Sequence, residues 1–337
     1  MREKIMDKNL VEKLVRVSGV QEGEVILIHY WGEEEHKEIA DWFMEAVTEL
    51  GGSPVFLQQS RALNQKLFSK AKIECFSENY FKLLEPIDAV LDIFAYQPVV
   101  LGSVLEKEQM DIYRKYMRNL FDQLMTKKRF TQIRIPTIEN AQESGLDPKD
   151  YIQRMNQAYD IDYDQLKKVC NEKVIQLSKS KTIKISTKGE HLLELVVEGR
   201  TWIADCGDGD LPCGEVYAAP VENQTNGTVC FESIYLEDVG EFEDVVMCIV
   251  EGKLQSCTKP EIQTFIDSLT ENDRVVCEIG FGYNEKVRSL CGYPVLDEKM
   301  CGTFHIAIGN NQMFGGENQS NIHLDFVGVG EAEINEQ

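Results

Sequence analysis

The pattern of apolar residues changes near residue 180, and this change constrains the fold more than any other feature of the chain. Before it, short apolar runs alternate with amphipathic stretches, as in Val25 to His29 followed by Glu35 to Leu50. Such alternation is typical of α/β folds, in which helices cover a sheet. After it, short strand-like runs such as Thr182 to Ser186 dominate. We therefore predict a two-domain α/β protein. Residues 1–180 form a layered α/β domain with connecting helices, and residues 181–337 form a strand-rich α+β domain.

Several boundaries of the predicted elements carry residues that favour them. Gly51 and Gly52 follow the first long helix, and glycine commonly ends a helix. Asp147 and Pro148 mark another helix start. The tail after Gly330 is acidic and contains asparagine, so we expect it to be frayed.

Composition excludes several classes of partner. The chain has 57 acidic and 35 basic residues among 337, a formal charge of -22. Such a charge repels nucleic-acid phosphates and anionic lipid surfaces, so we expect neither nucleic-acid nor membrane partners. The sequence from Met1 to Asn9 contains no apolar run of signal or transmembrane length, which predicts a cytoplasmic protein. The ten cysteines include no Cys-x-x-Cys pair, so neither a zinc knuckle nor a small disulfide framework is indicated.

Carboxylates and histidines gather in the last sixty residues. Glu278 lies in Val-Cys-Glu-Ile-Gly-Phe-Gly, His305 in Gly-Thr-Phe-His-Ile-Ala-Ile-Gly, and His323 and Asp325 in His-Leu-Asp. Alternation along a strand points residues i and i+2 to the same face, so His323 and Asp325 can reach one ion together. Burying Glu278 between apolar residues costs several kcal/mol without a cation. Each residue alone is more often structural, but together they favour a metal site.

Other candidate sites are weaker. His36 reads as a solvated helix start, His29 ends a strand in the other domain, and nothing ties His191 to a metal. The segment Gly207 to Pro212 begins like a dinucleotide loop, but Pro212 stands where the third glycine belongs. The chain has no Gly-x-Ser-x-Gly elbow and no P-loop, so serine and nucleotide chemistry lack their usual markers.

A set of motifs in the second half resembles a known family. The sequence has Pro212-x-Gly-Glu-Val-Tyr-x-x-Pro220, then Glu278-Ile-Gly-Phe-Gly, Asp297-Glu-Lys, Gly302-Thr-x-His-Ile-Ala-Ile-Gly309 and Ser320-x-x-His-x-Asp325. In order and local context these blocks are similar to the M29 family of metallo-aminopeptidases, also called the aminopeptidase T or thermophilic aminopeptidase family. The first strands of the N-terminal half fit as well, so the resemblance covers nearly the whole chain.

The resemblance implies a metal-dependent aminopeptidase that removes N-terminal residues from short peptides. It implies two divalent metal ions, zinc, cobalt or manganese, with ligands Glu215, Glu278, His305, His323 and Asp325. Such a pair activates water and polarises the scissile carbonyl without a side-chain nucleophile. We assign Glu298 and Lys299 to substrate contact or proton transfer, with a charged turn as the alternative. The resemblance also implies a homodimer formed through the second domains.

The chain departs from the family pattern after His305. The interval Asn310 to Asn318 is short, and Gln312 stands near the place of a tyrosine that better-known members carry. An amide replaces a phenol only partly as an oxyanion donor. Two alternatives therefore stay open: a single ferrous ion held by His305, His323 and Asp325, as in the similar dihydroxypyridine dioxygenases, or a metal-binding protein without catalysis. Retention of Glu215 and Glu278 argues against the iron site, which needs open coordination positions.

Overall fold

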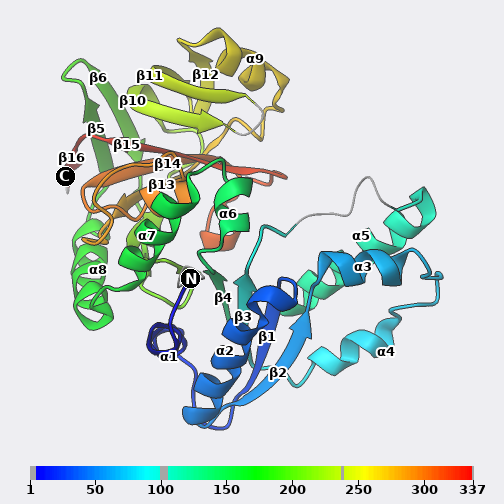
Figure 1. Ribbon diagram of the computed structural model, residues 1–337. Coiled ribbons are helices and arrows are strands. Elements are labelled where there is room, and N and C mark those ends of the chain that lie inside the picture. Colours follow the sequence, from blue (N-terminus) through cyan, green and yellow to red (C-terminus); the bar gives the residue numbers. More distant parts are fainter. Residues whose placement is uncertain (1–4, 99–104, 237–238, 336–337) are drawn as a thin grey trace. The chain divides into compact units, whose positions relative to one another are not determined.

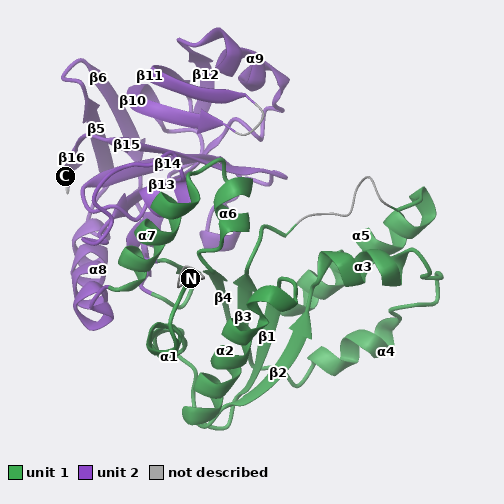
Figure 2. Cartoon of the chain, viewed as in Figure 1, with its two compact units in different colours: residues 1–160, 207–212 green, residues 161–206, 213–337 purple. Residues whose placement is uncertain are grey.

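The computed structural model describes residues 5–98, 105–236 and 239–335. The chain forms two compact units, shown in different colours in Figure 2. Unit 1 is Met1–Asp160 with Gly207–Pro212, and unit 2 is Ile161–Cys206 with Cys213–Gln337. The division follows Asp160 rather than residue 180, and a short segment of the second half belongs to the first unit.

Unit 1 is built on a sheet in which all neighbouring strands are parallel, in the order β2-β1-β3-β4-β8 (Figure 1). The strands are β1 (Val25–Trp31), β2 (Ser53–Gln58), β3 (Ala89–Phe94), β4 (Arg129–Arg134) and β8 (Asp210–Leu211). The central strands β1 and β3 are almost entirely buried, which explains their continuous apolar sequences. The α/β fold predicted for the N-terminal half is confirmed.

Unit 1 also contains helices, of which the one at Lys37–Glu49 packs on β1 and β2. They are α1 (Lys8–Val17), α2 (Lys37–Glu49), α3 (Arg61–Phe68), α4 (Glu78–Phe81), α5 (Lys107–Leu124), α6 (Ile138–Glu143) and α7 (Pro148–Tyr159), with 3-10 turns η1 (Glu34–His36) and η2 (Lys82–Leu84). Tyr113 and Leu120 of α5 join the core formed by Leu27 and Val90. Helix α7 begins where the sequence predicts, because the Asp147 carboxylate accepts a hydrogen bond from the Asp150 N–H.

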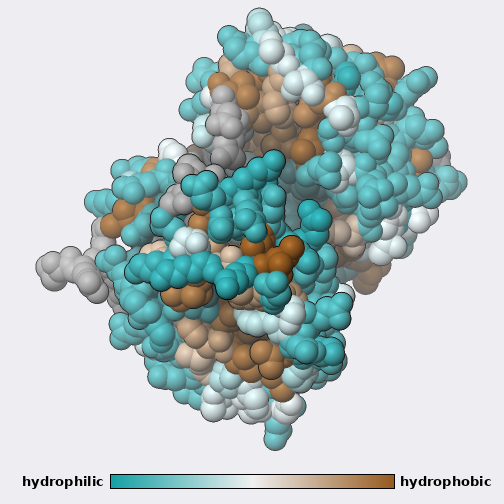
Figure 3. Space-filling model, turned by 90° about the vertical axis from the view of Figure 1, so that its right-hand side faces the viewer, coloured by the Kyte–Doolittle hydropathy of each residue, from teal (hydrophilic) through white to brown (hydrophobic). Residues whose placement is uncertain are grey.

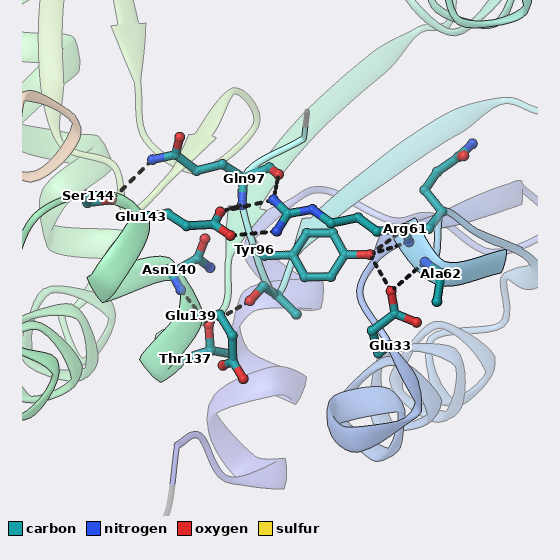
Figure 4. A network of polar contacts seen from close by, with 12 residues as sticks. Glu33, Arg61, Ala62, Tyr96, Gln97, Thr137, Glu139, Asn140, Glu143 and Ser144 are labelled. Carbon is teal, nitrogen blue, oxygen red and sulfur yellow. Dashed lines mark hydrogen bonds and ion pairs between the residues drawn. The ribbon is translucent and has the colours of Figure 1, made fainter. Parts of the chain in front are cut away.

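A polar network joins the carboxyl ends of β1 and β3 to helices α3 and α6 (Figure 4). Arg61 donates two hydrogen bonds to the Glu143 carboxylate, at 2.5 and 3.0 Å, and a third to the Gln97 carbonyl. Its guanidinium lies 3.9 Å from the centroid of the Tyr96 ring. The Tyr96 hydroxyl lies 3.2 Å from the Glu33 carboxylate. The network fixes four loops and helix ends with charge-assisted bonds.

Unit 2 contains two antiparallel sheets. One has the order β12-β11-β10-β6-β5-β16, and the other has the order β15-β14-β13-β9-β7. The first sheet comprises β5 (Thr182–Thr187), β6 (His191–Val196), β10 (Asn226–Leu236), β11 (Gly240–Val250), β12 (Lys253–Cys257) and β16 (Glu331–Asn335). The second comprises β7 (Ile203–Asp205), β9 (Glu215–Ala218), β13 (Val276–Gly282), β14 (Thr303–Gly309) and β15 (His323–Val329). We refer to this second sheet as the metal-site sheet.

The ring of Phe231 on β10 packs at a tilt against Phe304 of β14 and Phe326 of β15, so aromatic side chains contribute to the core between the two sheets. Unit 2 also has helices α8 (Tyr163–Leu177), α9 (Pro260–Ser268) and α10 (Pro294–Asp297) and the 3-10 turn η3 (Gln312–Phe314). The strand-rich α+β texture predicted for the second half is confirmed.

The expectation of a frayed tail after Gly330 is wrong. Residues Glu331 to Asn335 form β16, which pairs with β5 in antiparallel register. The backbone of an edge strand can pair whatever its side chains, so the acidic residues Glu331 and Glu333 remain exposed while their N–H and C=O groups bond to β5.

Among the described residues, no helix is both long and apolar enough to cross a membrane. On the face drawn in Figure 3, hydrophilic residues cover most of the surface and hydrophobic residues form small separate areas.

Candidate metal centre

The metal-site sheet brings the predicted ligands together from four strands. Glu215 lies on β9, Glu278 on β13, His305 on β14, and His323 and Asp325 on β15. A bulge in β13 shifts the register so that Glu278 lies opposite Ala307, and Asp325 lies opposite Ala307 from the other side. Residues that face one another across neighbouring strands project to the same face of the sheet.

At this sheet, ligand atoms of two residue groups converge. In one group the atoms come from Glu278, His305 and Asp325, and in the other from Glu215, Glu298 and His305. Within each group the atoms lie within 4.8 Å of one another. His305 belongs to both groups and is fully buried, so it joins them into one centre. The second group adds Glu298 to the ligands that the resemblance implies.

Distances between donor atoms test whether cations fit. His305 Nε2 lies 3.1 Å from Glu278 Oε1 and 3.5 Å from Glu215 Oε2. His323 Nε2 lies 3.3 Å from Glu278 Oε2 and 3.5 Å from Asp325 Oδ1. Ligands bound at about 2.1 Å to one ion in tetrahedral or octahedral geometry lie about 3.0 to 3.4 Å apart. The spacing of these donors therefore fits coordination of shared cations.

Hydrogen bonding to the other ring nitrogen orients His323. Its Nδ1 lies 3.0 Å from the Asn310 carbonyl, which can only accept a hydrogen bond, so Nδ1 carries the proton. Nε2 then faces the carboxylates, and it is the nitrogen that would bind a metal after losing its proton, as in many metal-bound histidines. Glu215 Oε2 is buried and accepts no hydrogen bond from the described residues. A buried carboxylate oxygen without a donor is a second observation that fits a cation.

Lys299 supplies a buried positive charge beside the same carboxylates. Its side chain is 1% exposed, and Nζ lies 2.5 Å from Glu215 Oε1 and 2.8 Å from Glu298 Oε1. Asp205 Oδ2 lies 4.0 Å away. The prediction of Glu298 and Lys299 as functional residues placed them in a charged segment before His305, and the structure brings both into the centre. Both residues lie in the turn that follows Asp297, and both side chains are buried.

Burial and neighbouring charges act against one another at the carboxylates. Burial raises the pKa of Glu215 to about 8, although the Lys299 ammonium opposes this rise. Burial also tends to raise the pKa of Glu278, but hydrogen bonds from His305 and His323 outweigh it and lower the value to about 2. For His305, burial favours the neutral ring, and Glu278 and Glu215 together raise the pKa to about 9. In the absence of a metal, protons on the histidines thus supply the positive charge that the carboxylates require.

Two glycines in the Glu-Ile-Gly-Phe-Gly segment make room for the centre. A Cβ atom on Gly280 would lie 2.2 Å from the His305 ring, which crosses β13 at this residue. A Cβ atom on Gly282 would lie 2.1 Å from the Met300 carbonyl oxygen and 2.6 Å from the Glu298 carbonyl oxygen. The first glycine admits a ligand, and the second admits the backbone of the segment that carries Glu298 and Lys299.

Tyr217 also belongs to this face, although the sequence analysis passed over it. It follows Glu215 by two residues on β9, and β9 places it opposite Gly280. Its ring contacts Phe314 edge to face at 5.5 Å, and Phe314 contacts His323 at 6.0 Å. Burial, with the charges of Glu215 and Glu278, raises the pKa of Tyr217, so its hydroxyl stays protonated. Strand alternation from Glu215 was the signal that could have identified it.

The structure places the remaining sequence candidates elsewhere. Gln312, near the expected tyrosine position, is exposed on η3. His29 is buried on β1 and lies 2.8 Å from Asp92. The interpretation of His36 as solvated is wrong: its side chain is 14% exposed and lies 3.3 Å from Glu139. His191 begins β6 and contacts the Thr228 hydroxyl, and among the described residues it joins no group of metal-ligating type.

Comparison with known proteins finds a matching family and two similar folds. The family model described as thermophilic metalloprotease (M29) matches residues 8–336. The fold is similar to wild-type AmpT from Thermus thermophilus, with a TM-score of 0.68 and 16% identity over 97% of each chain. It is also similar to a 2,5-dihydroxypyridine dioxygenase from Pseudomonas putida KT2440, with a TM-score of 0.63 and 13% identity over 97% of this chain and 92% of that one.

No curated protein sequence matches the chain. At these identities the two solved structures establish the fold, whereas the family model matches nearly the whole sequence. The chain therefore belongs to the thermophilic metalloprotease (M29) family.

Proposed function

We propose that this metallopeptidase is an aminopeptidase that releases N-terminal residues from short peptides and uses two divalent metal ions. One observation carries the proposal: carboxylate and imidazole donors from four strands converge at ligand spacing around His305. The donor set of histidines and carboxylates without cysteine suits zinc, cobalt or manganese. Glu215, Glu278, His305, His323 and Asp325 are the proposed ligands, and Glu298 is close enough to join them.

Bound divalent ions at this centre would lower the pKa of a water molecule and polarise the scissile carbonyl. Glu298 has its carboxylate beside Glu215 and His305, where it can accept a proton from that water and pass it to the leaving amine. Burial raises the pKa of Glu298, and the Lys299 ammonium opposes the rise. Lys299 bridges Glu215 and Glu298 and so holds both carboxylates in place. It acts through these carboxylates as a positioning residue.

Tyr217 is our candidate for the hydrogen-bond donor to the developing oxyanion. Its hydroxyl remains protonated and lies on the face that carries the ligands, and no described residue accepts a hydrogen bond from it. One preorganised donor contributes about 10²- to 10³-fold to kcat in acyl-transfer enzymes. Tyr217→Phe should therefore lower kcat more than it changes KM, while the bound metal stays constant.

The decisive experiment removes metal with a chelator, restores zinc, cobalt or manganese, and counts bound ions by mass spectrometry. Peptides with a free N-terminus should be cut by the restored protein, and the same peptides with an acetylated N-terminus should not. Asp325→Asn should lose metal and activity, because it removes one carboxylate charge from the centre without changing its shape. Asp267→Asn, at an exposed position of the same unit, is the matched control.

The alternative functions give other results. One bound iron with oxygen-dependent ring cleavage would replace the aminopeptidase by a dioxygenase, and metal binding without any cleavage would leave a binding protein. A homodimer formed through the second domains in the cytoplasm is part of the proposal. Light scattering at micromolar concentration that gives the mass of one chain would remove the dimer.

A further inference from the structure

One edge of the metal-site sheet carries backbone groups without partners in the described part of the chain. Strand β15 is the outer strand, and among the described strands it pairs only with β14 within this sheet. The Asn310 N–H bonds to the Ile322 carbonyl, so even-numbered residues turn their backbone groups toward β14. The N–H and C=O groups of Asp325, Val327 and Val329 therefore point outward, and no described residue bonds to them.

The same edge is used for pairing a few residues later. Strand β16 continues β15 after Gly330, and the Lys181 N–H bonds to the Asn335 carbonyl. The backbone N–H and C=O groups of odd-numbered residues in β16 thus point toward β5. In β15, the backbone groups of odd-numbered residues point outward in the same way. Among the described residues, this side of the chain has a partner strand after Gly330 and none along His323–Val329. The continuous segment of β15 and β16 can therefore pair with a neighbouring strand on this side.

Side chains beside this edge lie on the same face of the sheet as the metal centre. By alternation, Asp325, Val327 and Val329 share the face that carries the ligands, whereas Phe326 packs on Phe231 from the other face. Val327 is half-buried, and Val329 is 43% exposed. The carboxylate of Asp325 thus lies in the metal centre, while its backbone N–H and C=O groups point outward at the strand edge.

We propose that peptide substrates bind as an added strand along the outer edge of β15, with backbone hydrogen bonds to Asp325, Val327 and Val329. This inference rests on the proposed aminopeptidase function and extends it to the conformation and class of the substrate. Main-chain pairing supplies affinity without selecting side chains, whereas Val327 and Val329 favour apolar residues after the scissile bond. The substrate class is therefore extended peptides of three or more residues with apolar residues following the first.

The test uses a pentapeptide probe of leucine and alanine with a free N-terminus and a reduced, uncleavable first amide bond. Its affinity for the metal-loaded protein is measured by calorimetry, with single N-methyl groups on the third, fourth or fifth residue. Strand pairing uses every second N–H of the probe. The third and fifth residues of the probe point their N–H groups to one side, and the fourth points its N–H to the other. We expect methylation on the side that faces β15 to weaken binding at least tenfold, and methylation on the other side to change it less than threefold. Equal affinities across the series would overturn the inference.

Variants test the protein side of the same bonds. Val327→Pro removes one outward N–H from an edge strand, where proline is tolerated, and should weaken probe binding at least tenfold. Val327→Thr keeps the N–H and the branched shape and should bind within threefold of the parent. If Val327→Pro does not fold, as judged by circular dichroism and metal content, the methylation series on the parent protein decides.

The experiments distinguish failure of the aminopeptidase function from failure of strand addition. If no peptide is hydrolysed, the aminopeptidase function fails, while probe binding still tests strand addition. If a second copy of the chain occupies this edge, probe binding will weaken as protein concentration rises and the chain dimerises. That result would overturn the proposal in favour of self-association.

Discussion

Lys299→Met isolates the buried ammonium as a stabilising element of the metal centre. Methionine keeps an unbranched side chain of similar length and removes the charge. The ammonium contacts Glu215 and Glu298 and is 1% exposed, so its loss leaves buried carboxylates without their cation. Removing one partner of a buried ion pair costs about 3 to 5 kcal/mol. For a unit of this size that corresponds to a fall in Tm of about 6 to 20 °C.

A bound metal should reduce this cost, because divalent ions at Glu215 supply the missing positive charge. Protons should reduce it as well. Burial raises the pKa of Glu215 to about 8, above its ordinary value of 4.5. A carboxyl with a raised folded pKa is destabilising when charged, so the deficit of Lys299→Met should shrink as pH falls from 8 toward 5.

Urea unfolding of metal-free and metal-loaded protein at pH 5 and pH 8 measures all three effects. Lys253→Met is the matched control, because Lys253 pairs with Glu271 at 2.6 Å but both side chains are exposed, at 36% and 67%. An exposed pair of this kind is worth about 0 to 1 kcal/mol. A loss of under 1 kcal/mol in metal-free Lys299→Met, or one equal with and without metal, would refute the reasoning.

Three further predictions concern the metal and the polar network. Gly280→Ala should abolish metal binding with the fold retained, since the new methyl group would lie 2.2 Å from the His305 ring; metal analysis and circular dichroism check this. Metal affinity should rise with pH between about 6 and 9, because coordination needs neutral imidazole and the pKa of His305 is about 9; calorimetry in two buffers counts the released protons. Burial tends to raise the pKa of Glu33, but hydrogen bonds from Ser60, Ala62 and Tyr96 lower it, so its stabilisation is present above about pH 4.5 and lost below. In urea unfolding, Glu33→Gln should therefore lose less stability than the parent protein as the pH falls.

Local patterns in the sequence were enough to predict the layered half of the fold. Strands such as β1 and β3 are buried on both faces, and continuous apolar runs between amphipathic helices indicate such strands directly. The tail shows the limit of this reasoning. β16 forms because β5 offers an edge in register, and a sequence pattern does not reveal that edge. Long-range pairing decided the structure of this segment.

The metal centre also has features that the sequence predicted and features that it did not. Spacing within one strand predicted that His323 and Asp325 act together, and family motifs indicated the other ligands. The position of Lys299 could not be predicted, because its partners Asp205 and Glu215 lie on β7 and β9, far away in the chain. The role of Gly280 depends on a ring from the neighbouring strand. Contacts across strands specify the electrostatics of the centre, whereas the proposed ligands could be named from sequence motifs.

Charge bears on the number of metal ions that the centre requires. Its carboxylates are Asp205, Glu215, Glu278, Glu298 and Asp325, five negative charges, and Lys299 offsets one of them, so 5 − 1 leaves four. With neutral imidazoles, one divalent ion would leave two buried negative charges uncompensated, whereas two ions would balance all four. Uncompensated buried charge costs several kcal/mol per group. This balance is consistent with the two ions that we propose. Without Lys299, the five carboxylates would exceed the charge of two divalent ions by one.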